Sequence, residues 1–259
     1  MTGYLAALFR HPVKGFSPEA LNSAQLKAGE AFPNDRIFAV ENGPSGFDPE
    51  APVFIPKQKF TVLAHIPQVA QARTAYDDAT GEFRAEAAGH PYFNGRLSDT
   101  QGRDALAAWL TALLGEHARG PLRVIESAPD HRFTDHPKGH VSIINLASVR
   151  DLEARLGREV DPLRFRGNLY VESWPAWAEN DWEGRKLMLG WAEAQVFKPI
   201  VRCAATHVNP QTAERDMDLV KALYDNYGHM NCGIYVHVTK PGPIGLGDAC
   251  TAPIHETAA

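Results

Sequence analysis

Short apolar stretches separated by turn residues dominate the first third of the chain. Residues 4–9 form one apolar run that ends before Pro12, and residues 36–40, RIFAV, form another. Four further runs have the length and composition of strands: residues 24–29, 60–66, 69–76 and 82–87. A proline-rich loop at 43–56 and a turn at 77–81 lie among them. Short strands with turn signals between them predict a β-barrel or a β-sandwich.

Helical periodicity first appears in residues 99–115. The apolar residues of this stretch recur at helical spacing: Leu106, Trp109, Leu110, Leu113 and Leu114. They predict an amphipathic helix whose apolar face packs into the core and which ends at Gly115. A second helix is predicted over residues 146–156, with Asn145 as its N-cap and Gly157 after its last turn. We expect a third helix over residues 216–227.

The second half of the chain returns to short strands. Strands are predicted at residues 122–125, 141–144, 186–189, 192–197 and 233–238. A turn at Gly190 makes the third and fourth of these a hairpin. Residues 242–247 are rich in Gly and Pro and predict a turn, and a last strand begins at Asp248.

Composition narrows the class of protein. With 259 residues, the chain suits one large domain or two medium domains, and a net charge of −5 argues against a general nucleic-acid binder. No apolar run reaches the length of a membrane span, and residues 4–9 are too short for a signal sequence. Three widely spaced cysteines do not make a disulfide framework and suit a reducing compartment. We therefore expect a cytoplasmic protein without nucleic-acid or membrane partners.

The candidate chemistry begins at Cys203, which directly follows Arg202. A thiol beside a fixed positive charge is held partly as thiolate, which attacks electrophiles and binds soft metals. The alternative is a small buried apolar residue, which is the usual role of a free cysteine. Cys232 and Cys250 have no such neighbour, and we interpret them as structural.

Two polar segments add candidate residues. Residues 161–172 run into an apolar strand on which Arg164, Arg166 and Asn168 alternate, so all three are expected to face one direction. The alternative is a solvated strand face. Residues 131–140, HRFTDHPKGH, carry three histidines and an aspartate, but Pro137 and Gly139 argue against a regular metal-binding helix. We favour a polar loop.

Four segments in register resemble the MOSC family, the molybdenum cofactor sulfurase C-terminal domain. They are DPLRFRGNLYVE, AWAENDWEGRKLMLG, RCAATHVNPQTAERD and GIYVHVTKPGPIGLGD. The earlier segments HPVKG and NDRIFAV resemble the β-barrel domain that precedes MOSC in the amidoxime-reducing component proteins. The resemblance implies a mainly β fold with some helices, in which residues 1–118 form the N-terminal β-barrel-like domain and residues 119–259 form the MOSC β-barrel domain.

The resemblance also implies a site for the molybdenum cofactor, Mo-molybdopterin. Cys203 matches the cysteine whose thiolate ligates molybdenum and is the implied catalytic residue. The implied cofactor-binding residues are Lys14, Gly15, Arg36, Arg166, Asn168, Arg202 and Tyr235. Gly15 stands where the family commonly has Ser, so its backbone N–H is the donor left at that position. Several fixed cations in an acidic protein suit the anionic cofactor, and a soft thiolate suits a sulfur-rich metal site.

Three functions remain open at this point. The first is an oxidoreductase that reduces small N-hydroxylated or N-oxide substrates. No ferredoxin-like cysteine cluster follows the MOSC segments, so electrons are expected from a separate donor protein. The second is a non-catalytic carrier of the cofactor, or of sulfur as a Cys203 persulfide. The third is a barrel that keeps the fold and binds no metal, which the Arg and Lys pattern disfavours.

Overall fold

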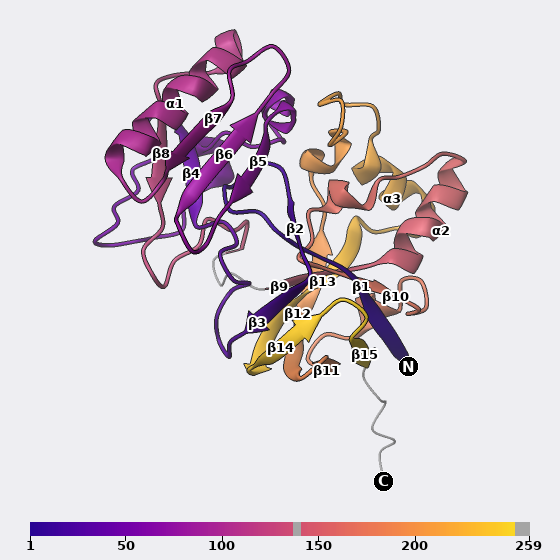
Figure 1. Ribbon diagram of the computed structural model, residues 1–259. Helices are drawn as coiled ribbons and strands as arrows, with labels where there is room; N and C mark the ends of the chain where they lie inside the picture. Colours follow the sequence, from indigo (N-terminus) through magenta and orange to yellow (C-terminus); the bar gives the residue numbers. More distant parts are fainter. Residues whose placement is uncertain (137–140, 252–259) are drawn as a thin grey trace.

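The computed structural model describes residues 1–136 and 141–251, and these fold mainly into β-structure (Figure 1). The strands are β1 Thr2–Arg10, β2 Glu19–Leu21, β3 Ser23–Leu26, β4 Phe38–Asn42, β5 Arg73–Tyr76, β6 Glu82–Glu86, β7 Phe93–Arg96, β8 Leu122–Glu126, β9 Val141–Asn145, β10 Leu169–Glu172, β11 Lys186–Leu189, β12 Ala192–Val201, β13 Asn231–Lys240, β14 Gly242–Gly245 and β15 Ala249–Thr251. The α-helices are α1 Thr100–Leu114, α2 Leu146–Leu156 and α3 Leu219–Tyr227. Short 3-10 helices are η1 Lys57–Lys59, η2 Pro67–Gln71, η3 Gly115–His117, η4 Pro162–Phe165, η5 Ala178–Asp181 and η6 Ala204–His207.

Seven strands close into a barrel, which we call the seven-stranded barrel. They follow the order β10-β9-β13-β12-β11-β15-β1, and β1 pairs with β10 to close the ring. A bulge between Leu5 and Ala7 shifts the register of β1 against β10, so that Leu5 and Leu8 both face the core. Closure removes the exposed edges that an open sheet of this size would present.

The N-terminal body consists of β4 to β8 and α1. Strands β5, β6 and β7 form one small sheet, β4 pairs with β8, and α1 covers them (Figure 1). The Asp99 side chain accepts a hydrogen bond from the Gly102 N–H at the start of α1, and Gly115 follows its last turn. Leu106 and Leu110 of α1 are buried in this second core. The fold class expected from the sequence is therefore confirmed.

The order of the chain does not follow the two bodies strictly. β1, at the N-terminus, lies in the seven-stranded barrel among strands from the second half of the chain (Figure 1). β3 pairs with β14, and β8 returns to the N-terminal body to pair with β4. The division of the chain at residue 118 stays a prediction.

Most predicted elements are present, and the differences have local causes. The predicted strand over residues 60–66 is wrong, because residues 63–65 form a turn and the segment pairs with β4 only through one bridge between Glu41 and Phe60. The predicted turn over 242–247 contains β14, because β3 offers it a partner strand. The two helices predicted with caps, α1 and α2, lie where the sequence placed them. None of the helices in the described ranges has the length and apolar character that a membrane span requires.

Candidate functional site

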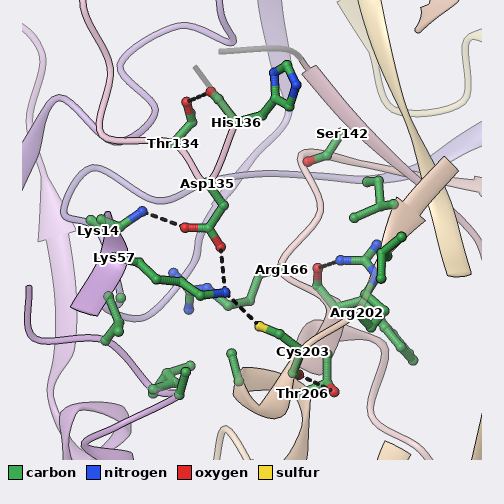
Figure 2. Close-up of a pocket in the computed structure, with 18 of the residues that line it drawn as sticks. Lys14, Lys57, Thr134, Asp135, His136, Ser142, Arg166, Arg202, Cys203 and Thr206 are labelled. Atoms are coloured by element: carbon green, nitrogen blue, oxygen red, sulfur yellow. Dashed lines mark hydrogen bonds and ion pairs between the residues drawn. The ribbon is translucent and has the colours of Figure 1, made fainter. Parts of the chain in front are cut away.

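A cavity of about 270 Å³ lies where the N-terminal body meets the seven-stranded barrel (Figure 2). Both bodies contribute to its wall, since Lys14 and Lys57 come from the first and Cys203 and Tyr235 from the second. The residues that line it are Lys14, Gly15, Arg36, Lys57, Val62, Leu63, Ala64, Thr134, Asp135, His136, Ser142, Arg164, Phe165, Arg166, Lys198, Ile200, Val201, Arg202, Cys203, Ala205, Thr206 and Tyr235. Seven of the eight predicted site residues are among them.

The described lining is strongly cationic. Seven of its residues carry a Lys or Arg charge: Lys14, Arg36, Lys57, Arg164, Arg166, Lys198 and Arg202. Against them stands the single carboxylate of Asp135. The whole chain has a net charge of −5, so this concentration of positive charge is local. A cavity of this kind attracts an anionic ligand.

Asp135 lies between two lysines. Lys14 donates to its Oδ1 at 2.5 Å, and the Nζ of Lys57 is 3.9 Å from its Oδ2 (Figure 2). Burial works to raise the pKa of Asp135, but Lys14 and Lys57 outweigh burial and hold that pKa well below its usual range. Lys14 also donates to the Phe133 carbonyl at 2.8 Å. The carboxylate is thus ionised at neutral pH and neutralises part of the lysine charge.

Cys203 lies two residues after the end of β12 and is the N-cap residue of η6. It is half-buried, and its Sγ accepts a hydrogen bond from Lys57 at 3.1 Å (Figure 2). The Thr206 hydroxyl donates to the Cys203 carbonyl at 3.0 Å and holds the backbone of this turn. Burial lowers the pKa of Lys57, but the attraction of Asp135 and of Cys203 outweighs it, so that the pKa is raised.

The cation that contacts Cys203 is therefore not its sequence neighbour. Arg202 lines the cavity, but its Nε donates to the Cys232 carbonyl at 2.7 Å and its Nη1 to the Phe165 carbonyl at 2.8 Å. These bonds tie the end of β12 to β13 and η4. The adjacency of Arg202 and Cys203 in the sequence marked the site, while Lys57 supplies the charge at the sulfur.

A second cationic group in the cavity wall consists of Arg36 and Arg166. Arg36 forms an ion pair with Asp35 and donates to the Arg166 carbonyl at 3.2 Å. Arg166 donates from Nη1 to the Phe16 carbonyl at 2.8 Å, while its buried Nη2 has no hydrogen-bond partner among the described atoms. Burial and the nearby Arg36 lower the pKa of Arg166 to about 10. Such an orphaned, buried donor at a cavity wall calls for an acceptor from a ligand.

Gly15 has a structural reason to be glycine. Its φ is +91°, and a Cβ at this position would lie 2.4 Å from the Thr61 carbonyl oxygen. A serine on this backbone would therefore require the chain around Thr61 to move. The glycine lines the cavity, where its backbone is the part that a ligand can contact.

The predicted alternation of Arg164, Arg166 and Asn168 along a strand is wrong. Residues 162–165 form η4, and Arg166 adopts a left-handed conformation with φ of 51°. Asn168 is absent from the cavity lining. Its Oδ1 accepts a hydrogen bond from the Ser142 hydroxyl at 2.8 Å, so Asn168 fixes Ser142, which lines the cavity. Arg164 donates to Asp216 at 2.9 Å, which draws its charge away from the cavity centre.

The histidine-rich segment divides between two surroundings. His136 lines the cavity, with its ring 5.0 Å from Phe197 and 6.0 Å from Tyr235. His131 instead packs against Phe133 at 5.2 Å, outside the lining. His140 lies outside the described residues. Residues 131–136 contain no helix or strand, in agreement with the predicted loop.

Three further lining residues are not among the predicted site residues: Lys57, and Asp135 and His136 of the segment that was predicted to be a polar loop. Lys57 sits in a KQK run that resembles any solvated surface segment, and Asp135 lies inside the polar loop. No group of three His, Cys, Asp or Glu side chains suited to a metal exists among residues 1–136 and 141–251. Cys203 is the soft side chain that the described cavity lining offers to a sulfur-rich metal centre.

Fold and site together define a β-barrel protein with a cationic, thiol-bearing cavity between two bodies. Residues 130–251 match the MOSC domain, and residues 2–117 match the MOSC N-terminal beta barrel domain. The chain therefore belongs to the MOSC family, with the N-terminal barrel domain that accompanies it.

The chain matches about half or less of the length of the curated relatives described here. A molybdenum cofactor sulfurase from Caenorhabditis elegans is 32% identical over 141 residues, which cover 53% of this chain and 19% of that protein. Mitochondrial amidoxime-reducing component 1 from Homo sapiens is 29% identical over 181 residues, which cover 58% of this chain and 52% of that protein. The YuaD protein from Bacillus subtilis has a TM-score of 0.43 at 12% identity, covering 96% of this chain and 94% of that one.

Proposed function

We propose that this protein binds a molybdenum cofactor in the cavity and acts as an oxidoreductase. The observation that carries the proposal is the half-buried thiol of Cys203 in a cavity with seven cations and one carboxylate. A soft thiolate suits a sulfur-rich metal centre, and the cations suit a ligand that carries a phosphate. The unpartnered Nη2 of Arg166 supplies a donor that the protein itself does not use.

Each residue has a role in this proposal. Cys203 ligates the metal, and Lys14, Arg36 and Arg166 hold the anionic part of the cofactor. Gly15 offers its backbone N–H, and Asn168 keeps Ser142 in place in the wall. Arg202 fixes the end of β12, and with it the position of Cys203. When bound, the cofactor supplies redox chemistry at molybdenum.

The name of one relative supports a proposal for the substrate class. The human relative is named as an amidoxime-reducing component, and we extend the reduction of N-hydroxylated or N-oxide compounds to this chain. His136 and Tyr235, which line the same cavity as the thiol, offer an aromatic surface for a small substrate. A separate protein supplies the electrons in this proposal.

A second function is a carrier of sulfur or of the cofactor. It is favoured by the similarity to the molybdenum cofactor sulfurase and by the Lys57 contact, since an ammonium stabilises a persulfide anion as well as a thiolate. A carrier would hold its cargo at Cys203 and show no turnover.

Metal analysis tests cofactor binding. Wild type and Cys203→Ala, purified from a host that makes the cofactor, are compared by molybdenum content per chain. We expect close to one molybdenum in the wild type and less than a tenth of that in the variant. Cys250→Ala removes a thiol buried in the barrel core and serves as the matched control, with wild-type metal content expected. Equal molybdenum in Cys203→Ala and wild type contradicts the ligand assignment.

Turnover separates the enzyme from the carrier. Loaded protein is supplied with benzamidoxime and a chemical reductant, and benzamidine is measured. Multiple turnovers per chain support the oxidoreductase. A persulfide on Cys203 detected by mass spectrometry, without molybdenum and without turnover, supports the carrier instead.

A further inference from the structure

One contact in the cavity joins the two bodies at the reactive atom itself. Lys57 lies on η1 of the N-terminal body, and its Nζ is 3.1 Å from the Sγ of Cys203, 146 residues away in sequence. Figure 2 shows the lysine side chain reaching across the cavity with its amine between Asp135 and the sulfur. The Lys57 side chain is 29% exposed, so the cavity shields this contact from much of the solvent.

The other polar groups around Cys203 direct their hydrogen bonds to other atoms, whereas Lys57 donates to its sulfur. The Nε and Nη1 of Arg202 donate to backbone carbonyls, and the Thr206 hydroxyl donates to the Cys203 carbonyl rather than to Sγ. Asp135, 3.9 Å from Nζ, attracts the ammonium from the other side. Within the described part of the chain, Lys57 is thus the donor to this sulfur.

A hydrogen bond to a metal-bound thiolate has a known physical effect. The donor and its positive charge withdraw electron density from the sulfur, which stabilises the metal in its more reduced state. Hydrogen bonds to sulfur ligands are among the levers by which proteins set the reduction potential of a metal centre. A charged donor in a partly desolvated cavity acts more strongly than a neutral one.

We infer that Lys57 is a positioning residue that raises the reduction potential of the metal centre at Cys203 through its N–H···S hydrogen bond. The inference rests on the proposed function, because it needs molybdenum bound at Cys203. Lys57 acts here through the sulfur and needs no contact with substrate. The N-terminal body would then contribute to the redox properties of the centre as well as to anion binding.

The test is a redox titration of protein loaded with the cofactor, in which electron paramagnetic resonance of the metal monitors the fraction of reduced centre. Lys57→Met keeps a long side chain but removes the donor and its charge. At an ambient potential that half-reduces the wild type, we expect the ratio of oxidised to reduced centre to rise about tenfold in Lys57→Met. That change corresponds to a potential about 59 mV lower for a one-electron couple. Molybdenum content per chain is measured on the same samples.

Three further variants separate the hydrogen bond from general charge effects. Lys57→Arg retains the charge and the donors and is expected to restore most of the wild-type potential. Lys57→Gln retains an N–H donor without charge and is expected to fall between wild type and Lys57→Met. Lys59→Met removes an exposed charge two residues further along η1, outside the cavity lining, and should leave the potential unchanged.

The outcomes distinguish the two proposals. A wild type that binds no molybdenum overturns both. A loaded wild type whose Lys57→Met and Lys57→Gln variants titrate at the wild-type potential overturns only the role of Lys57. A shift in Lys59→Met as large as that in Lys57→Met also overturns it, because a general surface-charge effect would then suffice.

Discussion

The two ends of the cavity differ in how firmly the protein holds them. At the arginine end, Arg36 pairs with Asp35, which is 2% exposed, and Arg166 donates to a backbone carbonyl. At the thiol end, the half-buried Cys203 meets Lys57 across a partly open space. The arginine end is thus part of the folded core. At the thiol end, we expect substitutions to have little effect on the free energy of unfolding. The predictions below test this contrast, from the largest expected effect to the smallest.

The largest effect is expected from breaking the buried ion pair of the arginine end. Arg36→Leu leaves the Asp35 carboxylate buried with its charge no longer paired by the guanidinium. Removing one partner of a buried pair typically costs about 3–5 kcal/mol of the free energy of unfolding. Arg84→Leu breaks an exposed ion pair with Glu82 and is expected to cost less than about 1 kcal/mol. Chemical denaturation measures both, and equal small losses would contradict the contrast.

Gly15 tests the close approach of backbone to backbone at the arginine end. Gly15→Ala places a methyl group 2.4 Å from the Thr61 carbonyl oxygen at a φ of +91°. We expect a loss of about 1–3 kcal/mol in the free energy of unfolding from strained backbone together with the clash. Gly89→Ala is the matched control, since its φ is +76° but nothing lies within 4 Å of the new methyl group. A loss in Gly15→Ala no greater than in Gly89→Ala would show that the clash is relieved at no cost.

His11 should make the arginine end sensitive to acid. Burial, followed by repulsion from Arg166 and Arg36, lowers the pKa of His11 from 6.5 to about 3. The unfolded chain therefore binds a proton at a pH where the folded protein does not. The contribution of neutral His11 to the free energy of unfolding is complete above pH 6.5. It is lost as the pH drops from 6.5 towards 3, by up to about 1.4 kcal/mol per pH unit.

The measurement is the free energy of unfolding at several pH values in wild type and His11→Asn. The variant is expected to lose the slope between pH 6.5 and about 4, because it removes the titrating group. Asp35 contributes mainly below its ordinary value of 3.8, since its own pKa is depressed in the folded protein. A wild type whose stability is flat across pH 4 to 6.5 would contradict the assignment.

The contrast also explains which parts of this protein could be predicted from sequence. The limits of α2 followed from Asn145 and Gly157, because caps are local signals. The contact between Lys57 and Cys203 joins residues 146 apart, and no local pattern marks it. The family resemblance located Lys14 and Arg36, since their segments carry motifs. It gave no indication of Asp135, which lies in a polar loop.

The errors at the site have a tertiary cause. Arg166 was expected on a strand from its alternation with its neighbours, but η4 precedes it and its φ is 51°. Two contacts distant in sequence hold Arg166 there: its carbonyl accepts from Arg36, and its Nη1 donates to the Phe16 carbonyl. The Gly and Pro content of β14 favours a turn locally, but pairing with β3 makes this segment a strand. In both cases a pairing distant in sequence overrides the local preference.

The smallest effect on folding is expected at the thiol end. Cys203→Ser keeps a small polar side chain at a half-buried position that faces Lys57, so the free energy of unfolding should change by less than about 0.5 kcal/mol. Cys250→Ser places a hydroxyl at a fully buried position in the barrel core and is expected to cost about 1–3 kcal/mol. Denaturation of the two metal-free variants measures the difference. If Cys203→Ser proves as destabilising as Cys250→Ser, then the thiol end is part of the folded core like the arginine end, and the contrast between them fails.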